Sequence, residues 1–262
     1  MNIFILYLIT GSIGGFIGGL LGLGGGIIFV PFLFFIFTHF EIHSSNIMQS
    51  AVSTSLVCVI ISSFSAAIKH NKNKLINWNI FKLMLPGLAI GSIVGVSLIT
   101  LLSSDLIKIY YGILLIIIAI YLLIEVDDTK KIIKKNFKYI NIFSIFTSSI
   151  STLLGIGGGT LTTPYFKYYG ESMKTSIATA SACGVPIALL GIIATLVINL
   201  FFNIFDKTVL DFIDYYAFIL ISSSTLIFSY LGASLSFVTK INILKNLFSL
   251  ALLIIGIAIL NF

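Results

Sequence analysis

The chain has 262 residues, of which 58% are hydrophobic and only 9% are charged. A soluble domain needs far more charge to cover its surface, so this composition excludes an ordinary water-soluble protein. The formal net charge of +6 comes from lysines alone. Membrane topology explains this charge better than nucleic acid binding, so we expect no nucleic acid partner.

Apolar runs follow one another along the chain, and most are long enough to cross about 30 Å of hydrocarbon. Three of them, at 26–38, 139–155 and 159–169, are shorter. We therefore predict an all-α polytopic membrane protein with eight to ten membrane segments. In chain order, the expected segments are 3–22, 26–38, 47–68, 80–102, 106–124, 139–155, 159–169, 174–202, 212–238 and 242–261.

The lysines predict how these segments are oriented, because lysine concentrates on the cytoplasmic side of membrane proteins. The richest cluster lies in the linker 126–138, which we place in the cytoplasm together with the basic loop Lys69–Lys74. If each pair of segments around a triple glycine returns to its starting side, both termini lie outside. Thirteen of the fifteen lysines then face the cytoplasm, and only Lys108 and Lys207 do not.

Two similar stretches suggest an internal duplication. "GLLGLGGGIIFVP" starts at Gly19, and "TLLGIGGGTLTTP" starts 133 positions later at Thr152. The "AVSTS" after the first copy aligns with "IATAS" after the second. We predict two inverted repeats, 1–125 and 139–262, each a glycine-broken helical hairpin plus three transmembrane helices. In this architecture the substrate binds near the midplane between the repeats.

The triple glycines indicate where an anion could bind. Each glycine inside a helix costs about 1 kcal/mol relative to alanine, so three in a row predict a turn between two short helices. The helix after each turn presents free N–H groups and the positive end of its dipole. Close helix packing is the alternative, as for the spaced rows Gly11–Gly19 and Gly87–Gly95. The candidate anion-binding glycines are Gly22, Gly24, Gly25, Gly26, Gly155, Gly157, Gly158 and Gly159.

Hydroxyl side chains and prolines follow the glycines in both halves. The hydroxyls could donate hydrogen bonds to an oxyanion, or could bond to carbonyls of their own helix. We expect Pro186 to break its long helix and open a backbone gap beside the site. Pro31 and Pro164 either help to set the site or only shape their helices. The candidate hydroxyl ligands are Ser53, Thr54, Ser55, Thr179 and Ser181.

Several expected absences narrow the function. No Asp, Glu, Lys or His lies in the middle of a predicted span, which disfavours a cation pump. The sequence has no ATP-binding motif and no catalytic or metal-binding cluster in the spans, so we expect no enzyme activity, cofactor or metal. We place His39, His43 and His70 in loops, and treat Cys58 and Cys183 as small packing residues.

The glycine motifs make the sequence similar to a known family across essentially the whole chain. It resembles the sulfite exporter TauE/SafE family, also called the toluenesulfonate uptake permease family. The matching features are "GFIGGLLGLGGGIIFVPFL", "AVSTS", "INW" before "LPGLAIGSIVG", "LLGIGGGTLTTP" and "SACGVPIALLG". The resemblance implies a transporter of sulfite or organosulfonates in a bacterial plasma membrane. One departure is Ala180, which aligns with Thr54 of the first polar patch.

These observations together predict a transporter that moves a small oxyanion across the lipid bilayer by alternating access. Two alternatives stay open, a passive anion channel and a scaffold that assembles a membrane complex without transport. The sequence does not fix the anion, the direction, the coupling ion or the oligomeric state, a homo-oligomer included.

Overall fold

A computed structural model describes residues 2–43, 45–124, 139–202, 207–236 and 241–262. Within these ranges the chain is helical and has no strand. The basic linker 126–138 lies outside the described residues. The helices are α1 (Ile3–Leu21), α2 (Gly26–His39), α3 (Ile47–Lys72), α4 (Trp78–Leu101), α5 (Ser104–Ile124), α6 (Ile140–Leu153), α7 (Gly159–Tyr168), α8 (Met173–Phe202), α9 (Tyr215–Leu235) and α10 (Ile241–Asn261), with a short 3₁₀ helix at Val209–Phe212.

Six helices in the described part of the chain are long and apolar enough to cross a membrane. They are α1, α3, α4, α5, α8 and α9, and each covers one of the longer apolar runs to within a few residues. The chain is therefore an all-α, multi-pass membrane protein, as its composition predicts. The shorter segments also form helices, α2, α6 and α7.

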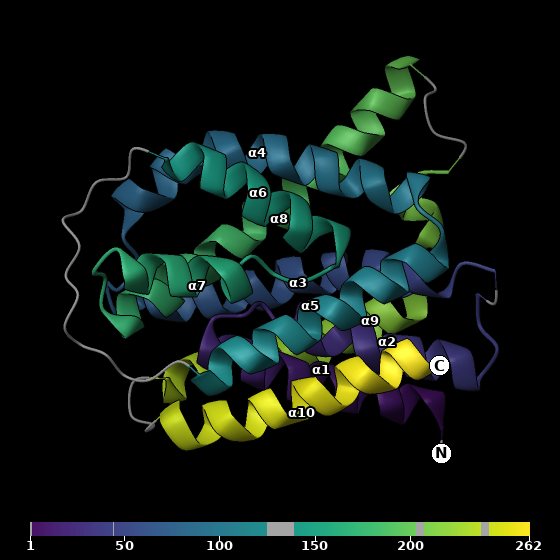
Figure 1. The fold of residues 1–262 in the computed structure, drawn as a ribbon, viewed down its shortest axis with the longest axis horizontal. Coiled ribbons are helices and arrows are strands. Elements are labelled where there is room, and N and C mark those ends of the chain that lie inside the picture. The colour runs from purple at the N-terminus through teal and green to yellow at the C-terminus, as the bar shows by residue number, and fades with distance from the viewer. Residues whose placement is uncertain (1, 44, 125–138, 203–206, 237–240) are drawn as a thin grey trace.

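The helices form one bundle with α3 running through its middle (Figure 1). The N- and C-termini lie at the same end, whereas α5 ends and α6 begins at the other end. The packing partners of the first five helices correspond to those of the last five. Thus α1 packs along α9 as α6 packs along α4, α2 contacts α3 as α7 contacts α8, and α5 pairs with α10.

Spaced glycines bring the two closest helix pairs together. A methyl group on Gly15 of α1 would lie 2.9 Å from the Cα of Thr225 in α9. A methyl group on Gly95 of α4 would lie 2.8 Å from Cβ of Thr152 in α6. Such contacts leave no space for a side chain, so these rows serve close helix packing.

Two expectations about individual residues are wrong. Helix α8 continues through Pro186, because a proline removes only one backbone hydrogen bond and α3, α4 and α7 pack against this helix. His70 does not lie in a loop: it belongs to the last turns of α3, is fully buried and lies against the backbone of Gly19 in α1. The exposed His39 and His43 do lie at the end of α2 and just beyond it.

Candidate substrate site

The two triple-glycine stretches form the turns of two helical hairpins, α1–α2 and α6–α7. The first turn has Gly22, Gly24 and Gly25 at φ of 73°, 74° and 80°, and the second has Gly155 at 65°. These values lie in the left-handed region, which glycine adopts without the steric cost that a side chain brings. The helix breaks predicted at both stretches are therefore present, and glycine is what allows them.

The second arm of each hairpin is too short to cross the membrane. Helix α2 has 14 residues and α7 has 10. At 1.5 Å per residue they measure about 21 Å and about 15 Å, less than the roughly 30 Å of hydrocarbon. Both turns are buried within the bundle. The turns of both hairpins therefore lie inside the bundle.

The two turns contact each other, backbone against backbone. A methyl group on Gly24 would lie 2.9 Å from the Cα of Gly157. One on Gly26 would overlap the carbonyl oxygen of Gly155, and one on Gly159 would overlap that of Gly22. The fold thus joins two stretches 133 positions apart, and their lack of side chains is what permits the contact.

Gly25 and Gly158 differ from the glycines in that contact. A methyl group on Gly25 would meet the ring of Phe29 and the backbone of Gly14, and one on Gly158 would meet the side chain of Ile187. Neither faces the backbone of the opposite turn. Gly158 also has φ of −53°, a conformation open to any residue.

Backbone N–H groups of both turns are available as donors. Within the described residues, the N–H groups of Gly24, Gly25 and Gly26 donate no hydrogen bond, and those of Gly157 to Gly159 donate none either. The first N–H groups of a helix have no acceptor in their own helix, and the helix dipole adds a partial positive charge there. The turns therefore offer uncharged donors suited to an anion.

Three of the five candidate hydroxyls hold segments of the protein together. Thr54 Oγ1 accepts a hydrogen bond from the N–H of Asp214, at 2.9 Å, and Thr179 Oγ1 accepts one from the N–H of Asn77, at 3.0 Å. Ser55 Oγ donates to the carbonyl of Gly155, at 2.8 Å. None of these bonds is made to the residue's own helix.

The Thr54 and Thr179 bonds occupy matching places. Asp214 caps the start of α9 and Asn77 caps the start of α4. Each threonine lies four residues before a buried cysteine, Cys58 or Cys183. Thr179, not Ala180, therefore corresponds to Thr54 in these bonds, and in this register Ala180 corresponds to Ser55.

The other two hydroxyls, on Ser53 and Ser181, are buried without a hydrogen-bond partner among the described residues. A buried hydroxyl without a partner costs about 1–3 kcal/mol. Water or a substrate could supply the hydrogen bond that Ser53 and Ser181 lack within the described part of the chain.

Further residues of the same kind escape sequence reasoning. Ser63 of α3 is buried without a partner, and its Oγ lies 3.0 Å from a methyl group placed on Gly24. It also touches Gly184, where α3 meets α8. The buried hydroxyls of Thr160 and Thr163 in α7 likewise have no partner in the part of the chain that the structure describes. Of these residues, only Thr160 could be predicted from the sequence, because it directly follows Gly159. Ser63 lies at the site because two helices that are distant in sequence contact each other.

Pro31 and Pro164 lie inside α2 and α7, five residues after Gly26 and Gly159. A proline cannot donate to the carbonyl four residues before it. The carbonyl released by Pro31 belongs to Ile27, and the buried Tyr111 of α5 donates its hydroxyl to it, at 3.1 Å. Pro31 thus shapes its helix and creates an anchor for α5.

The residues described contain no group of three or more His, Cys, Asp or Glu side chains that could hold a metal ion. The potential ligands gathered at the turns are backbone amides and hydroxyls. This donor set can hydrogen-bond an oxyanion without forming an ion pair with it.

Comparisons with known proteins agree with this architecture. The model of the family "Sulfite exporter TauE/SafE" matches residues 7–259. A probable membrane transporter protein of Haemophilus influenzae is 24% identical over 254 residues, which are 97% of this chain and 96% of the relative. One of Methanocaldococcus jannaschii is 31% identical over 189 residues, 71% and 69% of the two chains.

A third relative, a probable membrane transporter protein of Bacillus subtilis, is 28% identical over 180 residues, 62% of this chain and 66% of the relative. No solved structure matches the chain. Since the family match covers nearly all residues and the relatives share the membrane-transporter description, the chain belongs to the sulfite exporter TauE/SafE family.

Proposed function

We propose that this membrane transporter carries a small sulfur-containing oxyanion, such as sulfite or an organosulfonate, by alternating access. The observation that carries the proposal is the contact between the two glycine turns, with free N–H groups and unpartnered buried hydroxyls around it. The description of the matched family supports the class of substrate.

The mechanism rests on two inverted repeats, 1–125 and 139–262. The matched packing partners of α1–α5 and α6–α10 support this division, as do the corresponding bonds of Thr54 and Thr179. In such an architecture the substrate site lies between the repeats, and rocking one repeat against the other opens it to each side in turn. The direct contact between the turns corresponds to a closed arrangement.

The donors around the contact suit transport better than tight binding. Amide and hydroxyl groups donate hydrogen bonds to an oxyanion but carry no formal charge, so each contributes only about 0.5–1.5 kcal/mol. An anion held this way binds weakly and leaves readily. Gly158, Ser53 and Ser181 are the residues at which we expect it to bind.

The first experiment measures uptake and counterflow of labelled sulfite in proteoliposomes, with sulfate and taurine as competitors. We expect saturable flux with counterflow in the wild type. Ser53→Ala and Ser181→Ala each remove a hydroxyl that has no partner among the described residues, so the KM should rise about three- to tenfold while stability holds. Gly158→Ala keeps an allowed backbone conformation, and its methyl group would push aside the Ile187 side chain next to the turn, so we expect its KM to rise as well.

Ser65→Ala is the matched control. Its hydroxyl donates to the carbonyl of Leu226, at 2.7 Å, so this variant should lose stability and keep the wild-type KM. Flux of these anions without counterflow would indicate a passive channel and contradict alternating access. An unchanged KM in Ser53→Ala, Ser181→Ala and Gly158→Ala would show that the anion does not bind at the glycine turns.

A further inference from the structure

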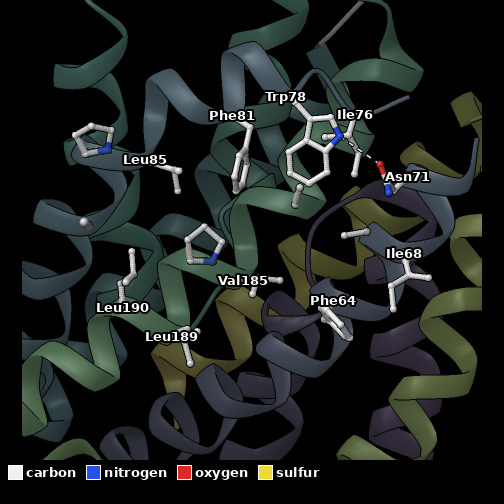
Figure 2. A pocket seen from close by; sticks show the side chains of 15 residues that line it. Phe64, Ile68, Asn71, Ile76, Trp78, Phe81, Leu85, Val185, Leu189 and Leu190 are labelled. Carbon is white, nitrogen blue, oxygen red and sulfur yellow. Dashed lines mark hydrogen bonds between the residues drawn. The ribbon is translucent and has the colours of Figure 1, made fainter. Parts of the chain in front are cut away.

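A large apolar groove lies between α3, α4 and α8, and none of its lining residues belongs to the glycine turns (Figure 2). Its volume is about 770 Å³. Phe64 of α3, Phe81 of α4 and Leu189 of α8 represent its three walls. The lining is almost entirely carbon, so the groove fits a hydrocarbon group and not a small hydrated anion.

The groove faces the surrounding bilayer. Phe64, Trp78 and Leu189 are 56%, 45% and 41% exposed, although they belong to helices that cross the membrane. Its one amide, that of Asn71, is engaged, because its oxygen accepts a hydrogen bond from the Trp78 indole, at 3.2 Å (Figure 2). A chain that enters from the lipid side therefore meets a surface that is apolar apart from the Asn71 amide and the Trp78 indole N–H.

A smaller polar pocket adjoins the groove. It has a volume of about 350 Å³ and includes Lys74, Asn77 and Thr175. The two cavities share Ile76 and Trp78, so they are continuous at the end of the bundle where α3 ends and α4 begins. An apolar groove that leads into a polar pocket matches the shape and polarity of a phospholipid.

The charges in and around the polar pocket favour an anionic headgroup. Lys74 lines the pocket itself, whereas the nearby Lys69 and Lys72 place their ammonium groups 5.1 and 5.7 Å from the centre of the Tyr230 ring. One acid is also nearby, since the Asn77 amide donates to the Glu171 carboxylate, at 3.4 Å, but the three lysines outnumber it. Lys74 is therefore the cation placed to meet a phosphate in this pocket.

Lys82 and Trp78 add to this preference. Lys82 follows Trp78 by four residues on α4, so both lie on the same face of that helix. Tryptophan is enriched at the level of lipid headgroups, and a basic residue near the surface contributes about 1 kcal/mol toward an anionic lipid.

We propose that this composite site binds an anionic phospholipid, with one acyl chain in the groove and the headgroup phosphate at Lys74. The proposal does not depend on the transported anion, since the groove lies outside the contact between the glycine turns. It assigns this end of α3, α4 and α8 to lipid recognition.

The chain carries its own probe for this site, because Trp78 is its single tryptophan. The experiment measures quenching of Trp78 fluorescence in full-length protein reconstituted with phosphatidylcholine, as brominated phosphatidylglycerol or brominated phosphatidylcholine is added. We expect the anionic lipid to quench at a several-fold lower mole fraction. In Lys74→Gln this preference should fall about fivefold.

Lys108→Gln is the matched control. Lys108 lies near the start of α5, beyond the far end of α4, and its ammonium is 4.0 Å from Asp105. This variant should keep the wild-type lipid preference. Equal quenching by the two lipids in the wild type would overturn the proposal, and so would a preference that survives Lys74→Gln. Loss of the preference on adding inorganic phosphate at constant ionic strength would instead assign the pocket to free anions.

Discussion

Thr54 and Thr179 each satisfy a backbone N–H at the start of a neighbouring helix. Asp214 directs its side chain into the first turn of α9, where Oδ1 accepts from the N–H of Ala217, at 2.8 Å. Asn77 does the same for Ile80 in α4, at 3.2 Å. The backbone N–H of each capping residue also needs an acceptor. The hydroxyl of a threonine in the other half of the chain accepts this hydrogen bond.

We predict that Thr54→Val and Thr179→Val each lower the free energy of unfolding by about 1–2 kcal/mol. Valine keeps the shape of threonine but leaves the N–H of Asp214 or Asn77 without its acceptor. Thermal unfolding of the purified protein in detergent measures the loss. Thr54→Ser and Thr179→Ser retain the acceptor and should stay closer to wild type. Equal losses for valine and serine would show that the methyl group matters and the hydrogen bond does not.

The sequence predicts the residue types of the site better than their roles. Hydroxyls after each triple glycine are visible in the chain, yet only the packing shows that Thr54 bonds Asp214 while Ser53 has no partner. Ser63 gives no such signal in the sequence, because its place beside Gly24 depends on contact between helices that are distant in sequence.

At the scale of the elements, glycine decides which helices can approach closely. In a bilayer the hydrophobic effect does not drive helices together, so backbone approach and van der Waals contact matter more. In α4, Gly87, Gly91 and Gly95 repeat every four residues and face α6. In α1, a row with the same spacing faces α9. The two closest helix pairs thus depend on the same device.

We predict that Gly91→Ala destabilises the protein by about 1–3 kcal/mol. The new methyl group would lie 2.9 Å from the Cα of Ile145 and would overlap its carbonyl oxygen, and backbone atoms cannot move aside without shifting α6. Gly112→Ala in α5 is the control, because its nearest neighbours are side-chain atoms of Leu260, which can change rotamer. Comparison of the two thermal unfolding midpoints tests this, and equal midpoints would contradict it.

Apolar runs predict these elements well because a membrane span needs a fixed length of hydrophobic residues. The run 47–68 underestimates α3, which continues to Lys72 and buries His70 against α1. Helix α8 persists through Pro186 because neighbouring helices support it. In both cases tertiary packing decides the local structure, and the local sequence gives no sign of it.

At the scale of the whole molecule, the two ends of the bundle differ in charge. The end where α3 stops and α4 starts carries Lys69, Lys72 and Lys74, whereas the opposite end holds both termini. The basic linker 126–138 connects α5 to α6, whose ends also lie away from the termini. We propose on this basis that the lysine-rich end faces the cytoplasm of a bacterial cell and that both termini lie outside.

Cysteine labelling in intact cells tests this orientation with little engineering. The native Cys58 and Cys183 are fully buried, so neither should react with a membrane-impermeant maleimide. Ser45→Cys, in the exposed loop before α3, should be labelled from outside. Asn73→Cys, in the exposed loop after α3, should be labelled only once the membrane is permeabilised. The reverse pattern would invert the topology, and labelling of both sites in intact cells would show that the chain inserts in two orientations.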